Sequence, residues 1–253
     1  MSASAPAYSL RDVTVRLGEK DVLLHVSADF AVGRVHVVRG VSGAGKTTLL
    51  RLLMGLVEPA SGSVRRPEGA RLAAAFQEDR LLDSLTVSAN VRLPHGRVGG
   101  PERARLLDET RRALAAVGMA GLESARAGEL SGGQRRRVSL LRAALSTSDV
   151  VFLDEPLRGL DEGSSRATMA WLLPRLAGKT VFWVTHSEAE AAARETAQTQ
   201  AQAQAQAQAQ VQSATCAAQE FSAAQEAVEA QNTLAEEAAP ADAAEAAETT
   251  IGG

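Results

Sequence analysis

Short apolar runs alternate with segments of helical periodicity over the first three quarters of the chain. Residues 35–39, 150–153 and 180–184 are rich in Val, Phe and Trp, which is the pattern of strands buried on both faces. Residues 48–54 follow a Gly-rich stretch and have the composition of a short helix. This alternation of strands and helices predicts an α/β domain built on a parallel sheet.

A longer helical stretch separates the first of these strands from the other two. Pro101 begins a segment whose apolar residues recur at helical spacing, and Gly118 ends it. A second helix is predicted to begin near Gly133. We therefore predict that the parallel sheet carries a helical insertion at about residues 77–147.

The composition of the chain changes near residue 195. Residues 196–253 consist of Ala-Gln repeats followed by an Ala- and Glu-rich stretch with almost no large apolar side chains. Such a segment cannot bury enough apolar surface to offset the entropy lost on ordering it. We predict one domain over residues 1–195 and an unpacked low-complexity tail over residues 196–253.

Bulk composition restricts the class of protein. The chain has no apolar run near the ~20 residues of a membrane span and no signal-peptide pattern, so we expect a cytoplasmic protein that reaches a membrane only through a partner. Its single cysteine, Cys216, cannot form an internal disulfide and is consistent with a reducing compartment. Residues 1–194 contain all 27 Lys and Arg and 21 of the 30 acidic residues, a net charge of +6 that suits an anionic partner such as a nucleotide or a nucleic acid.

A Gly-rich loop lies between the first predicted strand and its helix. The residues match G-x-x-x-x-G-K-[ST] and are Gly40, Val41, Ser42, Gly43, Ala44, Gly45, Lys46 and Thr47. We expect the backbone of this loop and of Thr48 to surround the phosphates of a nucleotide at the positive end of the helix. Lys46 would reach the β- and γ-phosphates, and the Thr47 hydroxyl would bind Mg²⁺. The plainer alternative is a Gly-rich turn beside a surface lysine.

Two adjacent carboxylates follow the predicted strand at residues 150–153. Asp154 lies where Mg²⁺ needs a second protein ligand, usually through a water molecule. Glu155 points in another direction and can polarise the attacking water as a general base. Asp-Glu-Pro is also a plausible turn after a strand, and the phosphate loop favours the functional interpretation.

The stretch Leu130-Ser131-Gly132-Gly133-Gln134 resembles the signature motif of ABC (ATP-binding cassette) ATPases. The resemblance implies that two copies face each other head to tail. In that arrangement Ser131, Gly132, Gly133 and Gln134 would contact the ATP bound by the partner copy. The alternative is a Ser-capped helix start with flexible glycines.

Three further markers of the same family occur in order. Gln77 resembles the Q-loop glutamine, which implies contacts to Mg²⁺ and to the attacking water. Asp161, in Gly159-Leu160-Asp161, resembles the D-loop that crosses the dimer interface. His186 resembles the switch histidine that senses the γ-phosphate. The resemblance covers about residues 8–194 and implies a phosphate-loop NTPase (RecA-like) core with an ABC helical subdomain.

The residues from Gln77 to Val87 are similar to the nitrate/sulfonate/taurine branch of ABC importers. The resemblance implies an ATP-hydrolysing subunit at the inner face of the cell membrane, with a permease, a second ATPase subunit and a solute-binding protein as partners, and no nucleic acid. Two alternatives remain open: a soluble ABC ATPase that acts on nucleic acid or ribosomes, and a catalytically dead ABC subunit.

Two features depart from the family pattern. The family usually stacks adenine on an aromatic side chain, and the matching place holds Leu17, which lacks the aromatic stacking contribution. A helix is expected to begin at residues 188–194, but the low-complexity tail replaces the final pair of strands that family members usually have. This second departure motivates the catalytically dead alternative.

Overall fold

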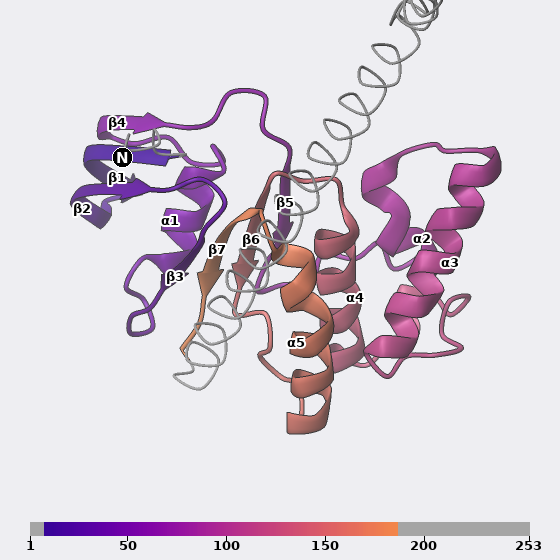
Figure 1. The fold of residues 1–253 in the computed structure, drawn as a ribbon. Helices are drawn as coiled ribbons and strands as arrows, with labels where there is room; N and C mark the ends of the chain where they lie inside the picture. The colour runs from indigo at the N-terminus through magenta and orange to yellow at the C-terminus, as the bar shows by residue number, and fades with distance from the viewer. Residues whose placement is uncertain (1–7, 187–253) are drawn as a thin grey trace, which may run out of the picture. The chain divides into compact units, whose positions relative to one another are not determined.

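The computed structural model of the protein describes residues 8–186, which form two sheets and the helices packed on them (Figure 1). The antiparallel sheet has the strand order β2-β1-β4, and the parallel sheet has the order β3-β7-β6-β5. The helix expected at residues 188–194 and the tail from residue 196 lie outside the described residues. The strands are β1 (Tyr8–Leu17), β2 (Lys20–Phe30), β3 (Val35–Val38), β4 (Ser61–Arg65), β5 (Leu72–Ala75), β6 (Val150–Asp154) and β7 (Thr180–Val184).

The predicted parallel sheet is confirmed, and its central strands are buried on both faces. Along β6, Val150 and Phe152 pack in one hydrophobic cluster with α1 and the antiparallel sheet, whereas Val151 and Leu153 pack in a second cluster with the later helices. Two-sided burial explains the continuous apolar run in the sequence. Residues 35–38 form a strand as predicted, but the prediction that this strand is buried on both faces is wrong. In the described sheet β3 is an edge strand, and its residues are only partly buried.

Five α-helices and two short 3₁₀ helices complete the described residues. They are α1 (Lys46–Leu53), α2 (Val87–Arg92), η1 (Leu93–His95), α3 (Gly100–Ala116), η2 (Ala127–Glu129), α4 (Gly132–Leu145) and α5 (Glu162–Leu176). Helices α3 and α4 begin close to the predicted Pro101 and Gly133. None of these helices combines the length and the apolar character needed to cross a bilayer.

Helix α4 connects the sheet to the other helices of the predicted insertion. It packs on α2 and α3 on one side and on β5 and α5 on the other (Figure 1). Its buried residues Val138, Leu141 and Ala144 belong to the same hydrophobic cluster as Val151 and Leu153 of β6. The start of α4 is therefore held at a fixed position relative to the carboxyl ends of the parallel strands.

Candidate nucleotide-binding site

The candidate site lies where the parallel strands end. The register pairs Val38 of β3 with Val184 of β7 and Val184 with Asp154 of β6, so three strands stop at the same level. Ala75 of β5 pairs with Leu153, one residue earlier. The segments that follow these strands therefore begin side by side, as expected for a parallel sheet whose ligand binds at the carboxyl ends of its strands.

The loop after β3 has the geometry of an anion cradle. Gly45, immediately before α1, has φ +82°, and a Cβ placed on it would lie 2.8 Å from Leu23 Cδ2, so no larger residue can occupy this position without a shift. Lys46 Nζ donates to the carbonyl oxygens of Gly40 and Val41, each at 2.8 Å. The ammonium group thus lies across the loop, at the positive end of α1, where both features attract an anion.

Thr47 and Asp154 join the loop to the end of β6. Thr47 Oγ1 donates to Asp154 Oδ2 at 2.8 Å, and the Asp154 side chain is almost completely buried. Burial raises the pKa of Asp154 and the neighbouring Glu155 carboxylate raises it further, while the Thr47 hydrogen bond and the charges of Arg136 and Lys46 lower it. A hydroxyl and a carboxylate oxygen at this separation are the hard oxygen ligands that Mg²⁺ binds together with phosphates and water, so the residues present fit that ion.

Glu155 is held on both carboxylate oxygens. Its Oε1 lies 2.6 Å from His186 Nε2, and its Oε2 accepts from Arg158 Nη1 at 3.3 Å. Its backbone has φ +48°, which is uncommon for a residue with a side chain, and its N–H donates to the Val184 carbonyl at 2.9 Å. The left-handed conformation directs Glu155 differently from Asp154. A held carboxylate beside a phosphate cradle can accept a proton from a water molecule.

These groups line one pocket of about 630 Å³. The predicted residues on its wall are Ser42, Gly43, Gly45, Lys46, Thr47, Thr48, Gln77, Asp154, Glu155 and His186. Val22, Arg158 and Thr185 also line it and were not predicted. Among the other predicted loop residues, Gly40 and Val41 bind Lys46, and Ala44 N donates to the Val41 carbonyl at 3.2 Å. The structure therefore places the phosphate loop, Gln77, both carboxylates and His186 around the same space.

Leu17, the residue expected beside adenine, is not among the residues that line the pocket. Leu17 ends β1 with 44% of its surface exposed, whereas Val22 of β2 lines the pocket. The expectation for Leu17 stays a prediction, and Val22 supplies an aliphatic contact surface that the sequence did not indicate.

The signature residues form a capped helix start outside this pocket. Ser131 Oγ accepts from Gln134 N at 3.3 Å, and Gln134 Oε1 accepts from Ser131 N at 2.9 Å, which is a capping box. Gly132 and Gly133 line a neighbouring pocket of about 500 Å³ that shares Gln77 and other residues with the first.

Asp161 caps a helix in the same way. It precedes α5 and accepts from Ser164 N at 2.8 Å, a hydrogen bond that lowers the pKa of its carboxyl group. Ser131 and Asp161 thus have local roles within their own chain, and their predicted contacts to a partner copy stay predictions.

Comparison with known proteins finds many relatives of this chain. Residues 23–158 match the family model described as ABC transporter. The aliphatic sulfonates import ATP-binding protein SsuB 1 of Agrobacterium fabrum is 40% identical over 194 residues, which are 74% of this chain and 68% of that protein. The protein of the same name from Mesorhizobium japonicum is 42% identical over 196 residues, 73% of this chain and 71% of that protein.

Solved structures are similar over the same part of the chain. The dimeric structure of MJ0796, a bacterial ABC transporter cassette, aligns with a TM-score of 0.63 and 25% identity over 71% of this chain and 88% of that chain. A dimeric post-hydrolysis state of the same cassette, bound to ADP and phosphate, aligns with a TM-score of 0.62 and 25% identity over the same shares.

Proposed function

This chain belongs to the ABC transporter family and is an ATPase, and we propose that it is the motor subunit of an importer for small anionic solutes. The observation that carries the proposal is the convergence of the Lys46 cradle, the Thr47–Asp154 pair and the held Glu155 on one pocket. Each of these features supplies one requirement of phosphoryl transfer to water: phosphate binding, metal binding and a base.

ATP binding is assigned to the loop and the start of α1. Lys46 would exchange its bonds to the Gly40 and Val41 carbonyls for the β- and γ-phosphates, and the backbone amides up to Thr48 would bind the same oxygens. Thr47, Asp154 and Gln77 would hold Mg²⁺, which neutralises charge on the phosphates when bound.

Hydrolysis is assigned to further residues that line the same pocket. Glu155 would accept the proton of the attacking water, and His186 would orient the carboxylate and sense the γ-phosphate. Arg158, whose Nη1 donates to the second carboxylate oxygen at 3.3 Å, would help to hold the carboxylate in place. Gln77 would position the water from the opposite side.

A second copy would complete the site. We assign Ser131, Gly132, Gly133, Gln134 and Asp161 of that copy to contacts with the bound ATP, so that two ATP molecules lie between two chains. The start of α4 is suited to this role, since it presents glycines and a helix N-terminus. The dimeric form of the similar cassette MJ0796 supports this assembly.

The transport role is supported by the similar proteins and by the Gln77–Val87 stretch. Relatives named as aliphatic sulfonate import proteins favour a sulfonate, with taurine, itself an aminosulfonate, or nitrate as related solutes. The chain would bind a permease at the inner face of the membrane, and a solute-binding protein would deliver the solute outside.

The test is reconstitution with a candidate permease and a candidate solute-binding protein from the same source as this chain. We expect co-purification with the permease and ATPase turnover that rises when binding protein loaded with an alkanesulfonate is added to proteoliposomes. A matched complex with Lys46→Ala should assemble and remain inactive. Turnover stimulated by nucleic acid and not by the permease would support a soluble ATPase instead, and an assembled wild-type complex without turnover would support a dead subunit.

A further inference from the structure

Arg136, five residues after Ser131, the N-cap of α4, is buried although arginine is rarely buried in proteins. Only 4% of its surface is exposed. Its Nη1 donates to the Phe76 carbonyl at 2.5 Å and its Nη2 to the Gln77 carbonyl at 2.7 Å. Nη1 also lies 3.1 Å from Asp79 Oδ1. One guanidinium thus binds both the backbone of Gln77 and the side chain two residues later.

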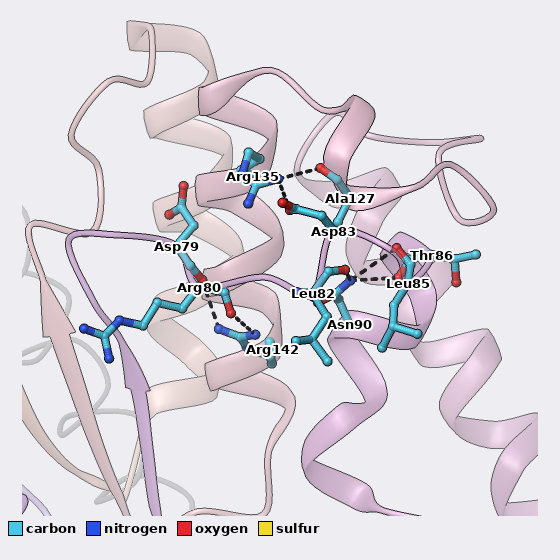
Figure 2. Close-up of polar contacts among 10 residues, drawn as sticks. All are labelled: Asp79, Arg80, Leu82, Asp83, Leu85, Thr86, Asn90, Ala127, Arg135 and Arg142. Atoms are coloured by element: carbon cyan, nitrogen blue, oxygen red, sulfur yellow. Dashed lines mark hydrogen bonds and ion pairs between the residues drawn. The ribbon is translucent and has the colours of Figure 1, made fainter.

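The rest of the loop after β5 is held from the same helix. Arg142 donates to the Asp79 and Arg80 carbonyls at 3.0 and 2.9 Å, and Arg135 binds the Asp83 carboxylate and the Ala127 carbonyl, each at 2.7 Å (Figure 2). The backbone carbonyls of residues 76, 77, 79 and 80 thus all accept from arginine side chains of α4, so the position of this part of the loop follows that helix.

A second contact fixes the far end of the loop. Asn90 of α2 accepts from Leu82 N at 2.8 Å and donates to the Leu82, Leu85 and Thr86 carbonyls (Figure 2). Asn90 therefore anchors the loop where it enters α2. Among Arg135, Arg136, Arg142 and Asn90, Arg136 is the residue whose side chain binds Gln77, and Gln77 lines the nucleotide pocket.

The charges around Arg136 make removal of its side chain costly. Asp79 is mostly buried, and burial raises its pKa while Arg136, Arg135 and Arg142 lower it. Arg136 also lies close enough to Asp154 to lower the pKa of that carboxyl. The buried guanidinium therefore pairs with the carboxylate of Asp79 in the loop, and it lines the same neighbouring pocket as Asp154 at the proposed metal site.

We propose that Arg136 is a positioning residue for ATP hydrolysis, which sets the location of Gln77 in the pocket from the helix that begins at Ser131. The inference rests on the proposed role of Gln77. Through Arg136, a displacement of Gln77 at one nucleotide moves the start of α4, the element proposed to contact the nucleotide of the other copy. Small displacements of a positioning group lower turnover strongly, by up to roughly 10²-fold for about 1 Å.

The test compares Arg136→Met with Gln77→Ala and with the double variant in the permease complex. We expect Arg136→Met to lower kcat at saturating ATP and Mg²⁺ by roughly tenfold or more, with ATP affinity changed by less than about threefold. Because Arg136 acts through Gln77, the double variant should match Gln77→Ala within about twofold. Arg136→Lys, which keeps the charge beside Asp79 but has a single donor nitrogen, should restore part of the turnover.

Arg66→Met is the matched control, since Arg66 also donates two N–H groups to a backbone carbonyl, that of Leu52, away from the pocket. We expect it to keep turnover within about twofold of the wild type. If Arg136→Met does not fold because Asp79 is left unpaired, Asp79→Asn/Arg136→Met removes both charges and takes its place, with Asp79→Asn as its reference.

A measurement that does not depend on ATP hydrolysis separates the proposed role of Arg136 from the proposed function of the chain. Amide hydrogen exchange of residues 76–80 in the nucleotide-free chain should quicken by about tenfold or more in Arg136→Met and remain unchanged in Arg66→Met. Unchanged exchange, unchanged kcat in a folded variant, or losses that multiply in the double variant would each overturn the inference. An inactive wild-type complex would count against the proposed function alone, and the exchange measurement would still decide the position of the loop.

Discussion

Replacing Glu155 by Gln tests the proposed base with little disturbance of the pocket. Gln has the same size, and its carbonyl oxygen can still accept from His186 Nε2, which lies 2.6 Å from Oε1 in the structure. The substitution removes the ion pair with Arg158, whose side chain is 59% exposed, and such pairs contribute about 0–1 kcal/mol. We therefore expect folding stability and ATP affinity to remain close to those of the wild type.

The expected loss lies in the chemical step. Removal of a general base lowers turnover by about 10²–10⁴-fold, which is roughly 3–5 kcal/mol of transition-state stabilisation. The assay is steady-state phosphate release at saturating ATP and Mg²⁺, with the dissociation constant of a fluorescent ATP analogue measured in parallel. Light scattering should also detect an ATP-dependent dimer in the variant, since bound ATP is not consumed.

Glu162→Gln is the matched control. Glu162 pairs with Arg166 at 2.6 Å on the surface of α5, is 88% exposed and does not line the pocket. Its turnover should equal that of the wild type. If Glu155→Gln binds ATP normally and keeps more than about a tenth of wild-type turnover, Glu155 is not the base. If it loses ATP binding, the carboxylate instead supports the shape of the pocket.

Three further predictions concern stability and assembly. Gly62→Ala should lower the free energy of unfolding in urea by about 2–5 kcal/mol, because Gly62 has φ +84° and the added Cβ would lie 2.4 Å from the Asp12 carbonyl oxygen. Gly18→Ala is the control, since Gly18 has φ +61° but open space around it, and it should cost about 1–2 kcal/mol. Equal costs would contradict the close approach of Gly62 to the Asp12 carbonyl. Arg71 lowers the pKa of Asp149 to about 2, below the value of 3.8 expected in the unfolded chain, so the ion pair stabilises the fold fully at pH values above 3.8. The wild type should therefore have a higher Tm than Asp149→Asn near neutral pH, and this difference should disappear as the pH falls toward about 2. Ser131→Ala should remove a cap worth about 1 kcal/mol and lower turnover further than this destabilisation explains, whereas unchanged turnover would confine Ser131 to capping.

The residues that the sequence singled out lie together around one pocket where chemistry and pattern coincide. A buried strand followed by a Gly-rich loop has few structural solutions, and Asp154 ends and Glu155 follows a strand that is buried on both faces. The register of the parallel strands then brings these segments together without any further signal.

The elements that sequence reasoning missed have weaker patterns. Strand β1 breaks its alternation at register shifts near Asp12, so its period-2 signal is interrupted. Strand β5 is Leu72-Ala-Ala-Ala, a composition without β-branched residues. Helix α5 distributes its apolar residues almost evenly around its axis and contains Pro174.

The roles of the arginines around the site could not be predicted from the sequence either. Arg135, Arg136 and Arg137 form one run after Gln134, and such runs are usually solvated. Only the packing of α4 on β5 buries Arg136 beside Gln77. Arg158 has a local signal, since it lies three residues after Glu155, a spacing at which side chains can pair across one turn.

The central claim is that Lys46, Thr47 and Asp154 bind Mg-ATP together, and calorimetric titration of the purified permease complex with ATP tests it most directly. With Mg²⁺ present we predict saturable binding of one ATP per chain, weakened by roughly a hundredfold or more in Lys46→Ala. Removing Mg²⁺ with a chelator should weaken wild-type binding and leave Asp154→Asn nearly unaffected. Binding that is the same in Lys46→Ala, or independent of Mg²⁺ in the wild type, would contradict the account.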